Sequence, residues 1–495
     1  MPAMAFVPLD ALTTTTSAEA MRDAISKTGC SSTSCGSDAG PADLPPDVWA
    51  RIKDHPCYSE EAHHFFARMH VAVAPACNIQ CHYCNRKFDC ANESRPGVVS
   101  ERLSPEEALR KVVTVANEVP QLSVLGIAGP GDALFDWTRT KRTFEMVSEA
   151  IPDIKLCVST NGLALPDHVE ELAAMKVDHV TITINMVDPA IGEKIYPWIY
   201  FEGRRYTGRE ASQILHERQM LGLEMLVKRG ILVKVNSVLI PGINDAHLPA
   251  VNAEVTKRGA FLHNIMPLIS DPAHGTHFGL TGQRGPTHAE LEAVQAECGG
   301  GARLMRHCRQ CRADAVGLLG EDRGQSFTLD RIAETVTYDA SKRDAYRDVV
   351  AREREDREKA KEAAMQNLGS TAAAAELLVA VATRGGGRVN QHFGHAREFQ
   401  LYRATPEGIA FMGLRRLEDA YCKDGEGEAN ILESIIAALQ GVDLVLVGKI
   451  GDSPKGKLEG AGLNVSDEYA HDYIETAISD YYARKFGAAP RALSA

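Results

Sequence analysis

The chain has 495 residues and a formal net charge of −12, with 44% hydrophobic and 24% charged residues. This length predicts two folded units, and the composition excludes a mainly disordered chain. The acidic balance excludes a general nucleic-acid or anionic-membrane binder. Because no signal-peptide pattern and no run of about 20 apolar residues is found, we expect a cytoplasmic protein that does not enter the membrane.

Residues 1–45 are predicted to form a flexible leader rich in Ser, Thr, Gly and Ala, which contains Cys30 and Cys35. The leader shows neither helical nor strand periodicity, and the spacing of its two thiols does not define a metal site, so their role stays open. Twelve cysteines in a chain without a secretory signal are too few for a disulfide scaffold. Their uneven grouping indicates metal binding or redox chemistry.

Residues 46–330 alternate short β-rich apolar runs with helical patterns. The expected strands cover 71–74, 122–128, 155–159, 179–185, 232–239 and 261–268. The expected helices cover 105–118, 140–150, 168–175, 210–229, 246–259 and 287–297. This alternation predicts an α/β fold, a partial (βα)6 TIM-like barrel whose chemistry lies in the loops that follow the strands.

The remaining chain is predicted to contain a linker and a second, smaller α/β domain. Residues 331–375 have the composition of a charged helical linker that ends in small polar residues. Residues 376–495 are assigned to the second domain. Its expected strands cover 377–383, 398–404, 408–414 and 443–451, and its expected helices cover 429–440 and 473–486.

The sharpest motif is CNIQCHYC, in which Cys77, Cys81 and Cys84 follow the first expected strand with the spacing C-x3-C-x2-C. Three thiolates can hold three irons of a 4Fe-4S cube and leave the fourth iron open to a substrate. A zinc knuckle is the main alternative, but zinc sites usually combine paired C-x2-C groups with a fourth ligand. The position of the motif after a strand of a βα series favours iron and sulfur.

This motif resembles that of the radical S-adenosylmethionine (SAM) superfamily. The resemblance implies that SAM binds the open iron through its amino and carboxylate groups, and that electron transfer cleaves a C–S bond of SAM. It also implies contacts to SAM from the aromatic residue before the last cysteine, from the glycine-rich loop after the second strand and from the end of the third strand. These residues are Tyr83, Gly129, Pro130, Gly131, Asp132 and Asn161. Taken alone, a Pro-Gly pair after a strand is more often only a turn.

Strand parity predicts which polar side chains face the interior of the barrel. Side chains alternate along a strand, so Cys157 faces inward if Asn161 does. The same parity turns Asn185 inward, where it is a further candidate for the cofactor site. The other inward polar residues are Ser159, Thr181, Thr183 and, as a weaker case, Asn236, which could be an ordinary buried hydrogen-bonding residue. Such residues indicate a cavity rather than a packed core.

Several cysteines exceed what one radical cluster needs. They are Cys57, Cys90, Cys157, Cys308 and Cys311. Cys308 and Cys311 form a C-x2-C motif, which alone could bind zinc, bind iron and sulfur or bind nothing.

The segments 55–64 and 68–105, with the cysteine pair near residue 310, resemble the NifB family of nitrogenase-cofactor biosynthesis proteins. The resemblance implies three 4Fe-4S clusters, of which one is the radical SAM cluster and two are auxiliary. It implies one auxiliary site at His70, Cys90 and Cys157, and another at Cys57, Cys308 and Cys311. His70 is the least secure ligand, because a histidine beside a strand is more often structural. His55, His63 and His64 compete with it.

The resemblance also implies the reaction. A methyl group from SAM is transferred to a cluster sulfide, a radical from a second SAM abstracts hydrogen from it, and two cubes fuse around a central carbide with one added sulfur. The product is the 8Fe-9S-C precursor of the nitrogenase iron–molybdenum cofactor. The implied partners are iron–sulfur cluster donors, an electron donor and nitrogenase cofactor carrier or scaffold proteins. Which residues accept protons is open; Glu60, Glu61 and Glu93 lie near the motif but would ordinarily be surface residues.

Residues 376–495 resemble the NifX-like family, which binds nitrogenase cofactor precursors. The loop 384–399 contains His392 and His395, which could approach an anionic cluster, beside Arg384 and Arg388, whose charge favours it. Cys422 could be an additional ligand. A loop with two exposed histidines and no ligand is the alternative. Cys298, near the end of a helix, is expected to have no ligand role.

Two other functional classes remain open at this stage. A peptide- or RNA-modifying radical enzyme would share the cysteine motif and the barrel, but it would need a substrate-binding domain that the sequence does not reveal. An iron–sulfur scaffold without enzymatic activity is the second alternative. Formation of 5′-deoxyadenosine distinguishes the scaffold from either enzyme.

Overall fold

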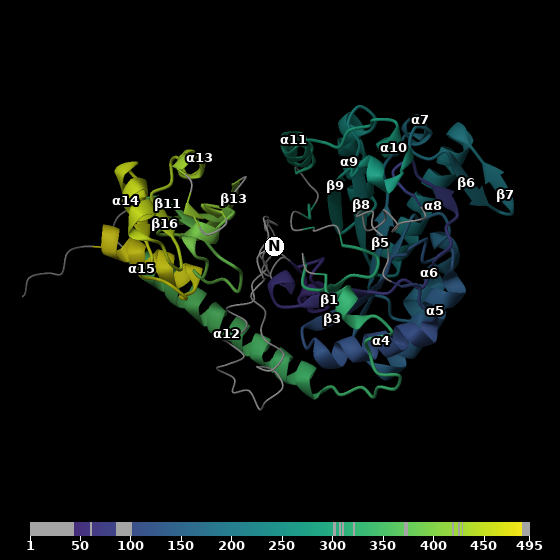
Figure 1. Ribbon diagram of the computed structural model, residues 1–495, viewed down its shortest axis with the longest axis horizontal. Helices are drawn as coiled ribbons and strands as arrows, with labels where there is room; N and C mark the ends of the chain where they lie inside the picture. The colour runs from purple at the N-terminus through teal and green to yellow at the C-terminus, as the bar shows by residue number, and fades with distance from the viewer. Residues whose placement is uncertain are drawn as a thin grey trace, which may run out of the picture. The chain divides into compact units, whose positions relative to one another are not determined.

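The computed structural model describes residues 44–59, 62–85, 101–299, 303–305, 308, 311–319, 322–370, 375–417, 420–423, 426–427 and 429–487. The chain separates into two compact units, with the boundary between Arg343 and Asp344 (Figure 1). No helix within the described ranges is long and apolar enough to cross a bilayer.

The first unit is built on a seven-stranded sheet with the order β10-β1-β3-β4-β5-β8-β9. Its strands are β1 (Ala67–His70), β3 (Leu122–Ile127), β4 (Lys155–Thr160), β5 (His179–Thr183), β8 (Leu232–Leu239), β9 (Leu262–Pro267) and β10 (Val316–Gly317). All neighbours are parallel except β10, which pairs antiparallel with β1. The sheet curls into a half-barrel, so the predicted mixed α/β barrel fold is confirmed.

Helices follow the strands as expected. They are α4 (Pro105–Glu118), α5 (Trp137–Ala150), α6 (Leu165–Ala174), α8 (Gly208–Lys228), α9 (Leu248–Lys257) and α11 (His288–Cys298). The start of α4 shows why the sequence predicts it so closely: Ser104 and Glu107 form a capping box, and Pro105 occupies the first turn. Shorter elements are α3 (Pro46–Ile52), η2 (Ala62–His64), α7 (Pro189–Gly192), η3 (Asp245–His247), η4 (Pro272–His274), α10 (His277–Leu280) and η5 (Gly324–Phe327).

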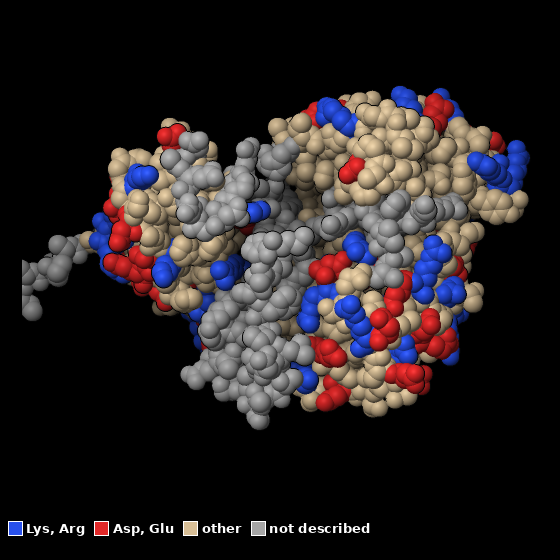
Figure 2. Space-filling view, viewed as in Figure 1, with Lys and Arg blue, Asp and Glu red and all other residues tan. Residues whose placement is uncertain are grey.

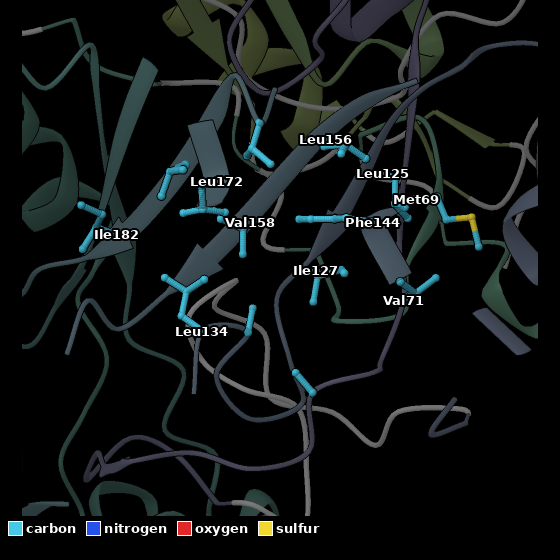
Figure 3. Packing of buried hydrophobic residues seen from close by; sticks show 14 of the residues in the cluster. Met69, Val71, Leu125, Ile127, Leu134, Phe144, Leu156, Val158, Leu172 and Ile182 are labelled. Carbon is cyan, nitrogen blue, oxygen red and sulfur yellow. The ribbon is translucent and has the colours of Figure 1, made fainter. Parts of the chain in front are cut away.

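The main core lies between the sheet and its covering helices (Figure 3). Met69, Leu125 and Val158 from three strands contact this core together with Phe144 of α5, and all four side chains are buried. Cys298 is buried in the same apolar cluster, and burial raises the pKa of its thiol to about 11. A thiol that resists deprotonation is a poor metal ligand.

The prediction of the first strand was wrong in position. Ladder pairing covers Ala67–His70, whereas 71–74 is extended and buried but makes only an isolated bridge between Ala74 and Pro130. An apolar buried run cannot be distinguished from a strand by its pattern alone. The segment stays beside β3, since the backbone N–H of Val71 donates to the Gly126 carbonyl at 3.2 Å, and it then leads into the cysteine motif.

A small second sheet in the barrel unit was not predicted. Its order is β2-β6-β7, with β2 (Ile79–Gln80) inside the cysteine motif and a hairpin of β6 (Trp198–Phe201) and β7 (Arg204–Tyr206). All of its pairs are antiparallel. The hairpin therefore holds the cysteine motif from one side.

The second unit has a five-stranded sheet with the order β13-β12-β11-β16-β17. Its elements are α12 (Ser341–Gly369, which begins just before the boundary), β11 (Leu377–Val381), η6 (Phe393–His395), β12 (Glu398–Thr405), β13 (Gly408–Arg416), β14 (Cys422–Lys423), β15 (Glu426–Gly427), α13 (Ala429–Ala438), β16 (Leu444–Leu446), α14 (Asp452–Gly460), β17 (Asn464–Ser466) and α15 (Ile474–Phe486). The separate, smaller α/β domain is thus confirmed. The charged stretch assigned to a linker forms α12, and its Leu368 shares an apolar core with Leu377 and Val379 of β11.

Candidate metal centre

The loop 77–84 holds the predicted radical-cluster ligands at the carboxyl end of the parallel sheet, where barrel folds place their chemistry. The side-chain amide of Gln80 donates to the carbonyl oxygens of Cys81 (3.0 Å) and Cys84 (2.9 Å), so the loop is tied to itself. Cys81 is buried, while Cys77 and Cys84 are half-buried against the same apolar cluster. Two of the three cysteines therefore have their backbone carbonyls bonded within the loop itself.

The glycine-rich loop 128–132 lies directly beside the start of the cysteine loop. The backbone N–H groups of Gly131 and Asp132 donate to the carbonyls of Ala74 (2.6 Å) and Ala76 (2.7 Å). A Cβ atom at Gly131 would collide with the Ala76 carbonyl, so only glycine permits this approach. The structure thus brings Gly129, Pro130 and Gly131 next to the start of the cysteine loop.

Asp132 is placed differently from the other predicted SAM contacts. Its carboxylate is fully buried and accepts hydrogen bonds from the backbone N–H groups of Leu134, Phe135 and Asn161 and from the Thr160 hydroxyl. Burial raises the pKa of Asp132 although these donors favour its ionised form. A carboxylate so completely satisfied organises the loop and the end of β4.

Asn161 connects this arrangement to the cysteine loop. Its side-chain amide donates to Oδ1 of Asn78 at 2.7 Å and lies 3.7 Å from Sγ of Cys77. Its backbone N–H donates to Asp132 at 2.6 Å. The buried Asp132 carboxylate therefore fixes the strand end that carries an amide against a predicted iron ligand.

Asn185 is bonded to Tyr83 of the cysteine loop. The amide of Asn185 donates to the hydroxyls of Tyr83 (2.7 Å) and Tyr196 (2.8 Å), and its Oδ1 accepts the N–H of Val238. Tyr83 is 3% exposed. Its burial raises its pKa, and the nearby Cys81 raises it further. Asn185 therefore ties Tyr83, two residues after Cys81 in the loop, to Val238 of β8.

The predicted ligands His70 and Cys157 face the same side of the sheet. The parallel registers join His70 to Gly126 and Gly126 to Cys157, so one row crosses β1, β3 and β4. Residues in one row of a parallel sheet point to the same face. Gly126 between them carries no side chain, and a Cβ there would lie 2.6 Å from Cδ2 and 2.9 Å from Nε2 of His70.

The hydrogen bond of His70 defines which nitrogen can bind a metal. Its Nδ1 lies 2.9 Å from the carbonyl oxygen of Arg312, and a carbonyl can only accept, so Nδ1 carries the proton. Nε2 is then the nitrogen with a lone pair, and it lies over Gly126. Metal-binding histidines usually donate their other N–H to a carbonyl or carboxylate in this way. Cys90, the third predicted ligand, lies outside the described residues.

The other predicted set also comes together. Cys57, Cys308 and Cys311 all pack against one apolar cluster of Leu262, Met305 and Leu319. Cys57 comes from the segment before β1, whereas the other two follow α11. Cys57 lies about 250 residues before the other two cysteines in the sequence, and the fold brings all three to the same apolar cluster.

Arg68 is a residue of this site that the sequence did not reveal. Its guanidinium is buried and donates through Nε to Sγ of Cys311 at 3.0 Å and through Nη1 to the carbonyls of Gly317 and Leu318. Burial lowers its pKa, but Cys311, Cys57 and the carboxylate of Asp322 together outweigh burial, so the pKa of Arg68 is raised. A buried cation next to two thiols stabilises thiolates and an anionic cluster. An arginine in a strand carries no sequence signal for this role.

The histidines that compete with His70 lie elsewhere. His55 is fully buried, its Nδ1 accepts the backbone N–H of Cys57 at 3.2 Å, and its ring packs on His179 and Tyr58. Burial, followed by the charge of His179, lowers the pKa of His55 well below its usual value. His55 therefore supports the turn that carries Cys57. His63 is buried, and the side chain of His64 is not among the described ones.

The donor chemistry of these sets fits clusters rather than single ions. Within the described ranges, no three His, Cys, Asp or Glu side chains are close enough to share one metal ion. In a 4Fe-4S cube each thiolate binds a different iron, so its ligands stand farther apart than those of a single ion. The thiols of these sets and Nε2 of His70 are donors that iron–sulfur clusters accept.

In the second unit, the predicted loop gathers His392, His395 and Cys422. The two imidazole rings lie 5.1 Å apart, and Cys422 Sγ touches Gly394 between them. Nδ1 of His392 accepts the N–H of Gly394 at 2.9 Å, so the neutral ring carries its proton on Nε2. Burial is the main cause that lowers the pKa of His392, and the nearby charges of His395 and Lys449 lower it further. His392 therefore presents an N–H donor through Nε2, unlike His70.

The two arginines of the loop are engaged within the second unit. Arg388 pairs with Glu353 of α12, and Arg384 donates to Gln391.

Comparisons with known proteins agree with both units. The Radical SAM superfamily model matches residues 71–253, and the Dinitrogenase iron-molybdenum cofactor model matches residues 375–484. A FeMo cofactor biosynthesis protein NifB from Sinorhizobium fredii is 65% identical over 98% of both chains. Proteins of the same name from Rhodobacter capsulatus and Azotobacter vinelandii are 67% and 56% identical, over 89% and 92% of this chain and 98% and 93% of theirs.

Radical SAM enzymes carry a 4Fe-4S cluster and use SAM. Identity above half over nearly the whole length, together with both domain matches, extends the resemblance seen in the motifs to the entire chain. The chain therefore belongs to the NifB family of FeMo cofactor biosynthesis proteins, as a radical SAM enzyme with a C-terminal domain of the nitrogenase-cofactor type.

Proposed function

We propose that this enzyme fuses two 4Fe-4S clusters, inserts a carbide derived from SAM and adds one sulfur, giving the 8Fe-9S-C precursor of the nitrogenase cofactor. Three clusters would then occupy the barrel unit. The radical cluster is held by Cys77, Cys81 and Cys84. The two substrate clusters are held by His70, Cys90 and Cys157 and by Cys57, Cys308 and Cys311.

One observation supports this assignment most strongly. Cys308 packs against the apolar cluster that contains Cys57 and Cys311, and it also packs against the cluster that contains Cys81 and Tyr83. A substrate cluster at Cys308 would therefore lie beside the radical site. Proximity of this kind is what hydrogen abstraction between the two sites requires.

The protein's own groups position the reactants. A 4Fe-4S cluster with bound SAM supplies, after reduction, a radical able to abstract hydrogen. Gln80 holds the cysteine loop, Asn161 sets an amide against Cys77, and the missing side chain of Gly131 lets the glycine-rich loop pack directly on Ala76 beside the cysteine loop. Arg68 balances the charge of a substrate cluster at Cys57 and Cys311.

The imidazole ligand gives one substrate cluster a replaceable attachment. Imidazole is neutral and leaves when it is protonated, whereas thiolates bind iron as anions. With Nδ1 bonded to the Arg312 carbonyl, Nε2 of His70 is oriented to bind and then release one iron during fusion. The two cysteines of that set would keep the cluster in the barrel.

The experiment that tests this function follows the fate of a methyl carbon. Anaerobically reconstituted protein is incubated with SAM labelled with ¹³C in its methyl group, a reductant and a sulfur source. The extracted cluster should contain eight irons and the labelled carbon. An extracted cluster without label, from protein that does form 5′-deoxyadenosine, would contradict carbide insertion.

For the second unit, we propose a carrier role for the cluster product. Its match to a nitrogenase-cofactor domain and the grouping of His392, His395 and Cys422 support this role. Nε2–H of His392 can donate to a cluster sulfide, while Cys422 and His395 offer lone pairs to iron. The partners would be cluster donors, an electron donor and the cofactor carriers that receive the product.

A further inference from the structure

We infer that the outer face of the β2-β6-β7 sheet is the docking surface for a small acidic protein that delivers one electron at a time. This inference rests on the proposed reductive cleavage of SAM, which needs an external electron for each turnover. It concerns the surface through which that electron enters. Four residues form the docking face: Gln80, Trp198, Tyr200 and Arg205.

Register and parity place these four residues on one side of the sheet. Gln80 is paired with Trp198, and Tyr200 with Arg205, across antiparallel strands. Trp198 and Tyr200 are two residues apart on β6, so they share a face. The alternate residues, Ile79 and Ile199, are buried in the apolar cluster of Cys81 and Tyr83, which fixes the other face as the inner one.

This face is the outer wall of the cysteine loop. The amide of Gln80 donates to the carbonyls of Cys81 and Cys84, and the backbone N–H of Tyr200 donates to the carbonyl of Asn78 at 2.6 Å. Paired strands lie about 5 Å apart. A redox group seated on β6 would therefore be separated from the cluster ligands by little more than one strand and its hydrogen bonds.

The chemistry of the face suits a protein partner. Tyr200 is a large side chain left 45% exposed, and the Arg205 guanidinium lies 4.8 Å from the centre of the Trp198 ring. Trp, Tyr and Arg are the residues that most often dominate the energetics of protein interfaces. The stacking holds Arg205 in place and leaves its charge at the surface, since the residue is exposed.

Charge selects an acidic partner. Arg204, Arg205 and Arg209 are exposed on or beside the hairpin with Lys194, and the nearby exposed acids are Glu193, Glu202 and Glu210. Figure 2 shows basic side chains gathered at the edge of the barrel unit that carries β6 and β7 in Figure 1. The chain as a whole has a net charge of −12, so an acidic carrier would be repelled by its average surface. At this hairpin the exposed cations outnumber the exposed carboxylates, so the local charge attracts an acidic carrier.

The test compares a protein donor with a small reductant. The variant is Tyr200→Ser with Arg205→Glu, and the matched control is Leu221→Ser with Lys228→Glu, which removes an exposed apolar side chain and reverses an exposed lysine on α8. The initial rate of 5′-deoxyadenosine formation is measured with limiting reduced ferredoxin of acidic pI and, separately, with excess dithionite, at low and high salt.

With ferredoxin, the Tyr200/Arg205 variant should be slower than the parent by at least about tenfold at low salt, and much of the parent's own rate should be lost at high salt. With dithionite, the variant should match the parent, and the control should match it with both donors. Equal loss with both donors would show that the face only supports the cluster, and no loss with ferredoxin would place docking elsewhere. A parent protein inactive with dithionite would instead contradict the proposed function.

Discussion

At the scale of single residues, His70 at the end of β1 and His392 at the start of η6 differ in their chemistry. Nδ1 of His70 donates to the Arg312 carbonyl, whereas Nδ1 of His392 accepts the N–H of Gly394. The first arrangement leaves Nε2 able to bind iron, and the second leaves a proton on Nε2. The hydrogen bond, and not the residue type, therefore separates a ligand from a donor.

Gly126 provides the space that His70 needs. A Cβ at this position would lie 2.6 Å from Cδ2 of the imidazole, closer than van der Waals contact allows. We predict that Gly126→Ala displaces His70 and loses up to one cluster of iron, while overpacking lowers the free energy of unfolding by about 1–3 kcal/mol. Iron and sulfide quantitation after reconstitution measures the loss. Gly456→Ala, on a helix with open space around it, is the control. Unchanged iron content in a variant that folds would remove His70 from the ligand set.

Asp132 is expected to act through the loop it organises. Asp132→Asn replaces one acceptor oxygen with an amide that faces its donors, so the free energy of unfolding should fall by about 1–3 kcal/mol. The affinity for SAM should fall with it, because Asn161 loses its backbone anchor. Denaturant unfolding and SAM titration measure the two effects. Asp167→Asn, an exposed carboxylate beside Arg218, serves as the control. Weaker SAM binding at unchanged stability would instead favour a direct contact of Asp132 with SAM.

Residue types with a strong local signature could be predicted from the sequence, and those defined by distant contacts could not. The spacing of Cys77, Cys81 and Cys84 is local, so the loop was recognised directly. Arg68 acquires its role from Cys311, which lies 243 residues away. No periodicity or spacing carries that information.

At the scale of elements, the second auxiliary set joins two segments that the barrel brings together. The turn with Cys57 is held by His55 and by the hydroxyl of Tyr58, which contacts the carbonyls of Val180 and Leu232. The segment with Cys308 and Cys311 continues into Arg312, whose carbonyl oxygen lies 2.9 Å from Nδ1 of His70, and then into β10, which pairs with β1. Both segments therefore have anchors that are independent of a metal.

Those anchors lead to a prediction about the triple variant Cys57→Ala, Cys308→Ala and Cys311→Ala. The barrel should remain folded and the radical cluster should load, but the protein should lack roughly one cube of iron, because each cube needs its three protein ligands. Iron content and 5′-deoxyadenosine formation are measured on the same sample. If the iron content equals that of the parent, these cysteines do not form one site.

The helices and strands of both units were largely predictable because their signals are local. Capping residues define α4, and β8 is a continuous buried run with the bounds expected from the sequence. The β6-β7 hairpin was missed because its identity depends on pairing with β2, a two-residue strand inside the cysteine motif. Pairing between distant segments leaves little trace in a single sequence.

At the scale of the whole molecule, α12 belongs with the second unit for nearly all of its length. Arg343 in its first turn is fully buried, and it donates to the Leu122 carbonyl and pairs with Asp153 of the barrel unit. From Asp344 onward the helix belongs to the other unit, where Glu353 pairs with Arg388, Arg357 with Glu475, and Leu368 packs in the core.

This division predicts where the chain can be separated. A fragment of residues 344–495 should fold and bind the cluster product, whereas a fragment of 376–495 should melt at a lower temperature, because it lacks Leu368 and both ion pairs. The barrel fragment 1–343 should still form the carbide-containing product. Thermal unfolding and product binding are the measurements. Equal melting temperatures would show that α12 contributes nothing to the second unit.

The central claim is that the loop with Cys77, Cys81 and Cys84 holds the cluster that cleaves SAM. The most direct measurement is 5′-deoxyadenosine formation by anaerobically reconstituted, dithionite-reduced protein, in the parent, in Cys81→Ala and in the control Cys298→Ala, whose thiol is buried in the apolar core. The parent and Cys298→Ala should form 5′-deoxyadenosine at similar rates, and Cys81→Ala should form none above background. Parent-like formation by Cys81→Ala would contradict the account.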